Sequence, residues 1–377
     1  MASIQTDGIT LSNGIHVNFQ PWFASGYRFT SLHIYEELGG YLADGQIDLQ
    51  IDGTGPSLDL LQNQKTGNLS ISQVTGGFSY EIPVSVTNVI HHKNFVTLEF
   101  KCISLLDFAQ KNQTVIWEKP IKDTIKALYP GKVDIRDGCE PDLNPDPSFY
   151  WQDHETNHSL CTKLCFAYKK DSIFSFGWEG LLIKDTMGNK SSWGKPDGHI
   201  EFRGDTSEAT QDNDYARPHQ PYIYRLPINV WEDTKPEVAI KDYTKYESPN
   251  LRVIKKYDKY YYMHKDYYQM DYNMSYNSDY LRSTYFQELR IMNDSLPNYK
   301  IGDVLWYQRE PIIQEQLSWP WKYYLVRSNE LFIATDSSEV FDEHGAKFGF
   351  VSRILALEED GSIAFGKDTD PMEEVSA

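Results

Sequence analysis

Basic side chains are scarce in this sequence: 36 Lys and Arg stand against 54 Asp and Glu, which leaves a formal net charge of −18 at pH 7. Proteins that hold nucleic acid or an anionic membrane need a basic face, so this balance speaks against both functions. No apolar run approaches the ~18 residues of a membrane-spanning helix. Residues 1–8 contain neither the basic start nor the apolar stretch of a secretory signal. We therefore expect a chain made in the cytoplasm that neither inserts into membranes nor binds nucleic acid specifically.

Cysteines and catalytic motifs are also few. Cys102, Cys139, Cys161 and Cys165 are too scattered for a disulfide framework, which indicates a reducing compartment. Cys161 and Cys165 lie one helical turn apart, which suits a metal site only if further ligands come from elsewhere, so packing inside a helix face is the favoured interpretation. Phosphate-binding glycine loops and the serine-hydrolase motif are missing. We expect no catalytic residue and no cofactor.

Aromatic residues, in contrast, are abundant, at 14% of the chain with 26 Tyr. Tyr is favoured at protein interfaces because its ring is apolar and its hydroxyl can still find a partner. The tract 257–280 concentrates these residues without a net positive charge, which favours packing over stacking on bases. A carbohydrate-binding tail module that uses this tract is one alternative. The candidate residues for a subunit or partner interface are Tyr260, Tyr262, Tyr267, Tyr268 and Trp306.

The sequence pattern predicts a β-rich α+β fold with two small β-barrels. Residues 1–108 form the first barrel, because five or six short alternating runs follow one another at spacings near ten residues. His91 and His92 fall in a turn between two of these runs. Residues 196–242 and 296–362 form the second barrel, with strand-like runs at 222–226, 237–240, 302–307, 322–327, 331–335 and 348–357.

An α/β insert at 109–195 separates the two barrels. Ile121, Ile125 and Leu128 form one helical stripe, which Tyr129-Pro130-Gly131 ends. A second helix is predicted over 156–168, followed by a hairpin of 172–177 and 180–184. A Tyr-rich, partly helical subdomain at 243–295 interrupts the second barrel, with a helix expected over 281–292. An acidic tail, 363–377, ends the chain.

One motif resembles a zinc peptidase: His154-Glu155-Thr-Asn-His158. Two His at i and i+4 of one helix can hold Zn²⁺ while the Glu serves as a general base. We expect Thr156 to be the N-cap of the helix instead, which leaves His154 outside it and destroys that geometry. Glu179, the available third ligand, falls in the predicted hairpin turn. No metal site is therefore expected, and a zinc peptidase built on His154 and His158 remains the second alternative.

The same region resembles a known family. Tyr150-Trp-Gln, Glu155-Thr156 opening a helix, Leu160 and Leu164 on successive turns, and the aromatic hairpin after it are similar to the central baseplate hub proteins of contractile-tailed phages, which are related to the hub part of the type VI secretion spike. Downstream, the run Tyr299-Lys-Ile-Gly-Asp-Val-Leu-Trp306 is similar to the family strand that opens the closing barrel half.

The resemblance implies a structural protein of the virion tail baseplate, made in the cytoplasm of a host bacterium, and not an enzyme. Hubs of this family form homotrimers whose two barrels per chain build a pseudo-sixfold ring around the DNA channel. The implied partners are a central spike protein on one side and a tail tube or tube-initiator protein on the other. A net charge of −18 suits a conduit that must not hold its DNA.

Overall fold

The structure, a computed structural model of the whole chain, describes about half of its residues. Nearly all of these lie in strands of four sheets or in short helices. The described residues are 8–23, 27–51, 63–73, 79–103, 107–117, 119–136, 139–142, 150–170, 172–185, 251–256, 259–264, 273, 277, 288–293, 296–297, 299–306, 323–335 and 347–357.

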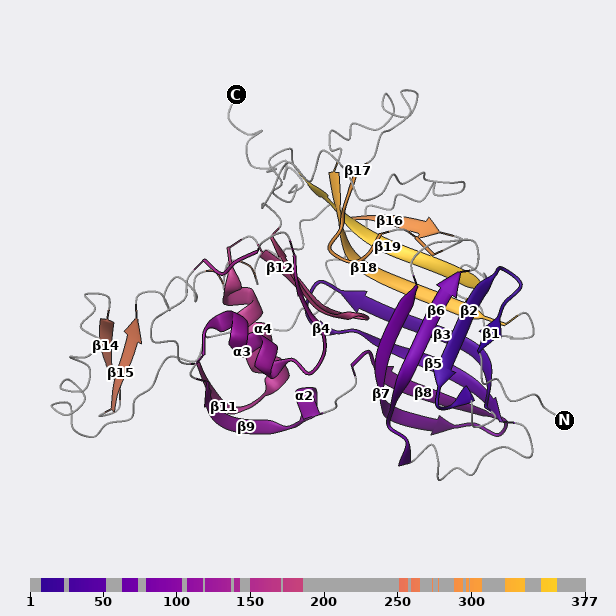
Figure 1. Cartoon of the computed structure of the whole chain (residues 1–377), viewed down its shortest axis with the longest axis horizontal. Helices are drawn as coiled ribbons and strands as arrows, with labels where there is room; N and C mark the ends of the chain where they lie inside the picture. Colours follow the sequence, from indigo (N-terminus) through magenta and orange to yellow (C-terminus); the bar gives the residue numbers. More distant parts are fainter. Residues whose placement is uncertain are drawn as a thin grey trace, which may run out of the picture.

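The largest of the four sheets is antiparallel and has eleven strands; it is drawn on the right of Figure 1. Its strands alternate as expected for one buried face: Ile15, Val17 and Phe19 of β2 are buried and the residues between them are not. The strand order is β1-β2-β6-β7-β8-β5-β3-β18-β19-β16, and β17 pairs with β18 off this path. The strands are β1 (Ile9–Thr10), β2 (Ile15–Gln20), β3 (Tyr27–Glu37), β5 (Asp44–Ile51), β6 (Thr66–Gln73), β7 (Tyr80–His91), β8 (Phe95–Lys101), β16 (Glu288–Asn293), β17 (Val304–Trp306), β18 (Tyr323–Ala334) and β19 (Phe348–Leu357).

The first and last β segments of the chain share this sheet, because β18 pairs with β3 on one side and with β19 on the other. Ile34 of β3 lies opposite Leu331 of β18. One continuous hydrophobic core draws on both segments. The β-rich prediction is confirmed, but the two barrels are not: in the described ranges, strands of the first and last β segments share one open sheet whose path runs from β1 to β16. β18 pairs along both of its edges, and this joins the two segments in one sheet.

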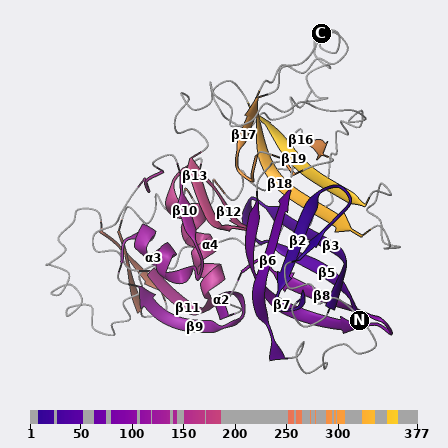
Figure 2. The same ribbon diagram turned by 45° about the vertical axis from the view of Figure 1, so that its right-hand side comes forward.

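The insert packs beside this sheet, as Figures 1 and 2 show from two directions. Its sheet, β10-β13-β12-β4, borrows β4 from the first β segment through a parallel pairing with β12. Helices α3 and α4 cover it, and the predicted stripe Ile121, Ile125 and Leu128 is buried in the insert core. The elements are β4 (Gly39–Leu42), α2 (Asp107–Gln110), β9 (Asn112–Trp117), α3 (Ile121–Leu128), β10 (Val133–Ile135), β11 (Tyr150–Thr156), α4 (Asn157–Tyr168), β12 (Ser172–Gly177) and β13 (Gly180–Asp185).

The Tyr-rich region, expected to be partly helical, contains strands in its described ranges. β14 (Leu251–Lys256) and β15 (Lys259–His264) form a two-stranded hairpin. The helix predicted over 281–292 is wrong for its last turns, because β16 pairs there with β19 of the large sheet. Tertiary pairing overrides local helix propensity there. The runs predicted at 222–226 and 237–240, the start of the expected helix and the acidic tail lie outside the described residues.

None of the helices in the described ranges is long and apolar enough to cross a membrane.

Candidate functional site

Three adjacent strands of the large sheet each carry one polar residue on the buried face: Glu36 on β3, Asn329 on β18 and Ser352 on β19. We call these three residues the polar row. They lie in register, since Asn329 is opposite Glu36 on one side and opposite Ser352 on the other. All three are buried, Glu36 with 3% of its surface exposed. A carboxylate at such a depth must be hydrogen-bonded, because an isolated buried charge costs several kcal/mol.

Hydrogen bonds run along the polar row in one direction, toward Glu36. Tyr299 donates its hydroxyl to Ser352 Oγ (2.9 Å), and Ser352 donates to Asn329 Oδ1 (2.8 Å). Asn329 in turn donates from Nδ2 to Glu36 Oε1 (2.9 Å). Such a chain polarises its members and strengthens each bond. The C-terminal strands are therefore joined to β3 by side chains as well as by the backbone.

The insert reaches the same carboxylate through the turn between β12 and β13. The backbone N–H of Trp178 donates to Glu36 Oε2 at 3.0 Å. Gly177 permits this approach, because a Cβ there would lie 2.6 Å from that oxygen. The Trp178 ring packs in the core of the large sheet, at right angles to Phe350. Glu36 thus binds all three parts of the described chain: the first β segment, the insert and the C-terminal β segment.

Burial dominates the electrostatics of Glu36. Desolvation raises its pKa from 4.5 to about 7, although the hydrogen bonds from Asn329 and Trp178 act to lower it. Nearby charges have smaller effects on the pKa of Glu36: Glu179 raises it and Lys300 lowers it. The carboxyl group therefore titrates close to neutral pH.

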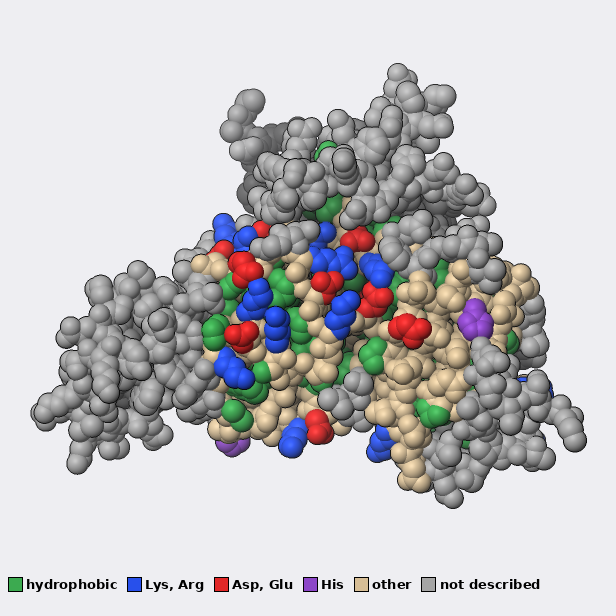
Figure 3. Space-filling model, in the orientation of Figure 1, with side chains coloured by type: hydrophobic (Ala, Val, Ile, Leu, Met, Phe, Trp, Pro, Cys, Tyr) green, Lys and Arg blue, Asp and Glu red, His purple; other side chains and the backbone are tan. Residues whose placement is uncertain are grey.

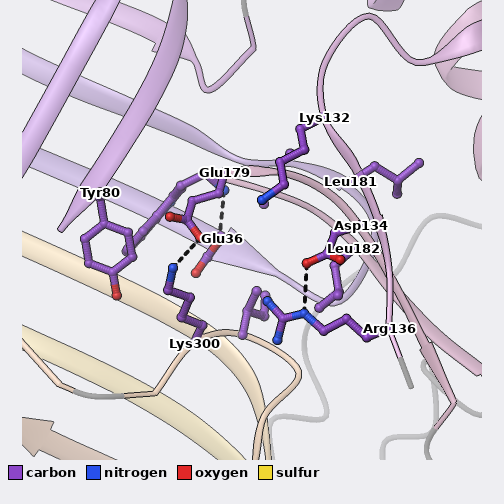
Figure 4. A pocket seen from close by; sticks show the side chains of 13 residues that line it. Glu36, Tyr80, Lys132, Asp134, Arg136, Glu179, Leu181, Leu182 and Lys300 are labelled. Atoms are coloured by element: carbon purple, nitrogen blue, oxygen red, sulfur yellow. Dashed lines mark hydrogen bonds and ion pairs between the residues drawn. The ribbon is translucent and has the colours of Figure 1, made fainter. Parts of the chain in front are cut away.

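Beside Glu36 lies a small pocket, shown in Figure 4, whose charged side chains are mostly paired with one another. Lys300 Nζ donates to Glu179 Oε2 (2.5 Å), so the turn of the insert is also held to the C-terminal segment by an ion pair. Arg136 binds Asp134 at 2.9 Å and Asp303 at 3.3 Å. On the face drawn in Figure 3, acidic and basic side chains interleave over the region where the insert meets the large sheet.

The pocket suits water or a small ion better than a substrate. Its volume is about 40 Å³, which is room for a few water molecules. Two buried donors on its wall, the Tyr80 hydroxyl and Trp178 Nε1, have no hydrogen-bond partner among the described residues. No group of three or more His, Cys, Asp or Glu side chains there is placed to hold a metal. The arrangement is one that joins parts of a fold.

The structure separates the two histidines of the zinc-peptidase motif. The cap prediction is confirmed: Thr156 Oγ1 accepts from the Ser159 N–H at 3.1 Å, and α4 begins after it. His154 lies at an irregularity of β11, with a φ of 49°, and its Nδ1 contacts Thr114 Oγ1 at 2.9 Å. Glu155 binds Ser159 and Lys163 of α4, so it supports the helix start.

His158 is a packing residue of the insert. Its Nε2 donates to the Gly40 carbonyl oxygen at 2.8 Å, since that oxygen can only accept. Its ring stands edge-on to Phe108 and Phe176. Burial lowers the pKa of His158 to about 4. His158 therefore stays neutral at physiological pH, and its geometry serves the link between α4 and β4.

The other predicted site residues stand as follows. Cys161 and Cys165 are buried in the insert core, as expected for a packing role, and all four cysteines are free thiols. Tyr260 and Tyr262 lie in β15, and Trp306 ends β17. Tyr267 and Tyr268 lie outside the described residues. The assignment of these aromatic residues to an interface stays a prediction.

Sequence reasoning missed the polar row, although strand parity contains a signal for it. Leu32 and Ile34 alternate toward the core, and continuing that alternation by one step reaches Glu36. In the same way, Asn329 continues the parity of Leu331 on β18. A charged residue at a core-parity position is therefore the sign by which such a site is recognised.

Solved structures that this fold resembles include phage tail proteins and type VI secretion proteins. One is the E. coli c3393 protein, a type VI secretion component described as similar to the T4 tail proteins gp27 and gp5 (9% identity, 93% of this chain and 79% of that chain, TM-score 0.48). Another is a tail protein from Neisseria meningitidis (10%, 93% and 99%, 0.46). A third is the 43 kDa tail protein of prophage MuSo2 from Shewanella oneidensis (12%, 93% and 98%, 0.43). At these values the likeness is distant, and no function follows from it alone.

No family model matches the sequence, and no curated protein matches it.

Proposed function

We propose that this chain is a structural hub of a phage tail baseplate, without enzymatic activity. The observation that carries the proposal is the segment from β11 to β13. The hub-like motif in the sequence predicts a strand, a helix that starts at Glu-Thr, Leu at two successive turns of that helix and an aromatic hairpin. The fold supplies these in order, with the Thr156 cap, buried Leu160 and Leu164, and Phe174 and Phe176 in the hairpin.

The described fold also supports a structural part whose internal geometry is fixed by several contacts. The insert is held to both β segments at once, through Glu36, through the Lys300–Glu179 ion pair and through Trp178 in the core. A part that transmits force between a tube and a spike needs such fixed internal geometry. These contacts between the insert and the two β segments supply that fixed geometry, and the small pocket has no part in it.

In the finer form of the proposal, three chains make a pseudo-sixfold ring around the DNA channel. The ring joins a tail tube or tube-initiator protein on one side to a central spike on the other. A net charge of −18 supports this role, because a negatively charged protein repels the phosphates of DNA and does not bind them. Head-to-tail contacts between identical chains close into a ring when the rotation per subunit fits. The protein would then be a component of the virion tail.

The test is the mass of the purified chain, alone and with the tube and spike proteins encoded beside it. Native mass spectrometry should find three copies of the 43.7 kDa chain, about 131 kDa. Negative-stain images should show a ring with a central hole. A chain that stays monomeric at high concentration and with each tail protein of its virion would contradict the proposal.

A further inference from the structure

The direction of the hydrogen bonds in the polar row depends on the charge of Glu36. The hydroxyls of Tyr299 and Ser352 can each donate and accept, and the Asn329 amide has a donor on one side and an acceptor on the other. An ionised carboxylate, in contrast, only accepts. The observed direction of the three bonds, from Tyr299 toward Glu36, is therefore the one that an ionised Glu36 requires.

A protonated Glu36 requires the opposite direction at its Oε1 atom. Oε2 accepts from the backbone N–H of Trp178, which cannot turn, so Oε1 is the oxygen that takes the proton. Oε1 lies 2.9 Å from Asn329 Nδ2, which is itself a donor, and two donors cannot form one hydrogen bond. Of the two groups that bind the Glu36 carboxyl, only the Asn329 side chain can accept the new hydrogen, and only through Oδ1.

A half-turn of the Asn329 amide exchanges Oδ1 and Nδ2 and reverses the whole row. Oδ1 then accepts from Glu36, and Nδ2 donates to Ser352 Oγ. Ser352 donates in turn to the Tyr299 oxygen, so the hydroxyl hydrogen of Tyr299 leaves the row. The heavy atoms need not move, because their separations of 2.8 to 2.9 Å suit a hydrogen bond in either direction.

The small pocket of Figure 4 gives the proton a path between Glu36 and solvent. Glu36 lines this pocket, which has room for a few water molecules. The charged residues of the insert that line it with Glu36 are Lys132, Asp134 and Arg136. Proton exchange with water therefore does not require the insert to separate from the large sheet.

The groups that face Glu36 from the surrounding elements leave it as the one that titrates near neutral pH. Glu179 of the β12–β13 turn and Lys300 of the C-terminal segment are paired with each other. Burial raises the pKa of Tyr80 on β7 and of Cys102 after β8, so both stay protonated. Burial also raises the pKa of Glu36 to about 7, so its two forms coexist there.

We propose that the polar row is a reversible relay, whose three hydrogen bonds change direction together when Glu36 gains or loses a proton. The Asn329 amide is the part that turns. The relay extends from the carboxyl that binds the insert turn, across β18 and β19, to Tyr299 of the C-terminal segment. The proton state of one buried carboxyl is thereby transmitted between distant parts of the chain. This inference does not depend on the proposed hub function.

NMR of the whole chain with ¹³C-labelled tyrosine and glutamate tests the relay, because the Cζ shift of a tyrosine depends on whether its hydroxyl donates or accepts. The Tyr299 signal is assigned by its loss in Tyr299→Phe. Between pH 5 and pH 8 this signal should move with the same midpoint as the Glu36 carboxyl carbon, near pH 7. Tyr27, buried on β3 outside the row, is the internal control and should not move. A Tyr299 signal that stays constant, or that moves with a different midpoint from Glu36, overturns the proposal.

Two variants separate the relay from a through-space effect of the Glu36 charge. In Glu36→Gln the Trp178 N–H keeps the amide oxygen on its side, so the amide nitrogen donates to Asn329 as the protonated carboxyl does. Tyr299 should then show its acid-form shift at every pH. Ser352→Ala cuts the row but retains Glu36, so Glu36 should still titrate and Tyr299 should not. A Tyr299 signal that titrates in either variant, or that takes its alkaline position in Glu36→Gln, overturns the proposal.

Discussion

A single carboxyl group, that of Glu36, is enclosed by residues from all three parts of the described chain. Its pKa is about 7 in the folded protein against an ordinary value of 4.5. Between these values the folded state keeps the proton that the unfolded state has lost. The free energy of unfolding therefore falls as pH rises from about 4.5 to 7, by roughly 3 kcal/mol at most.

The substitution Glu36→Gln should remove this dependence. The amide keeps the shape of the side chain and does not titrate, so the variant should lose less stability than the wild type between pH 5 and pH 8. Urea denaturation at the two pH values measures the difference. Glu81→Gln, at an exposed position of β7, is the control and should keep the wild-type dependence. A wild-type slope in Glu36→Gln would show that burial does not perturb this group.

His158 should produce a slope of opposite sign. Its pKa is lowered by burial from 6.5 to about 4, so the unfolded state takes up a proton before the folded state does. The free energy of unfolding therefore falls as pH drops from about 6.5 to 4. His158→Gln retains a donor for the Gly40 carbonyl and cannot charge, so it should be less acid-sensitive than the wild type. Thermal unfolding at pH 7 and pH 5 provides the comparison, and equal acid sensitivity of the two proteins would contradict the assignment.

At the scale of single elements, the β12–β13 turn depends on Gly180. Its φ is 131°, and a Cβ there would lie 2.4 Å from the Lys132 carbonyl oxygen. Gly180→Ala should therefore destabilise the protein by about 2 kcal/mol or more. Gly14, with a φ of 79° and no atom near its missing Cβ, is the matched control, and Gly14→Ala should cost only about 1 kcal/mol. Chemical denaturation measures the loss of stability in both variants. Equal losses would mean that a small backbone shift relieves the contact between the added Cβ and the Lys132 carbonyl oxygen.

The elements that sequence predicts well are those whose signals are local. The stripe of Ile121, Ile125 and Leu128 and the cap at Thr156 each lie within a few turns of chain, and both are present in the fold. The hairpin around Glu179 follows from two short apolar runs and a glycine. Residues close in sequence determine these features, so they can be predicted from one sequence alone.

The features that escape sequence reasoning depend on distant partners. The sequence predicts helix over residues 288–292 because no local signal indicates that β16 pairs with β19. The first and last β segments share a sheet in the described ranges through the pairing of β3 with β18, which the local pattern of neither strand specifies. The parity of Leu32 and Ile34 marks Glu36 as a core position, but it does not identify the groups that bind the carboxylate. Those groups, Asn329 and Trp178, lie far along the chain.

At the scale of the whole molecule, charge governs the response to DNA. A protein of net charge −18 offers few phosphate contacts, so duplex DNA should not bind even at low salt, where electrostatic attraction is strongest. Fluorescence anisotropy of a labelled duplex at about 20 mM salt tests this, with a basic DNA-binding protein as the positive control. Saturable binding that weakens steeply with added salt would contradict the proposed role of a passive conduit.

The pairing of β3 with β18 has a consequence for how the protein is made. Glu36 and Asn329 are separated by 293 positions, so the ribosome must add all of them before the contact can form. At synthesis rates of about 5–20 residues per second, that takes roughly 15 to 60 s. Throughout this interval the nascent chain presents β3 as an open edge and Glu36 without Asn329. The speed of translation therefore sets how long each new molecule is exposed to misassociation with its neighbours.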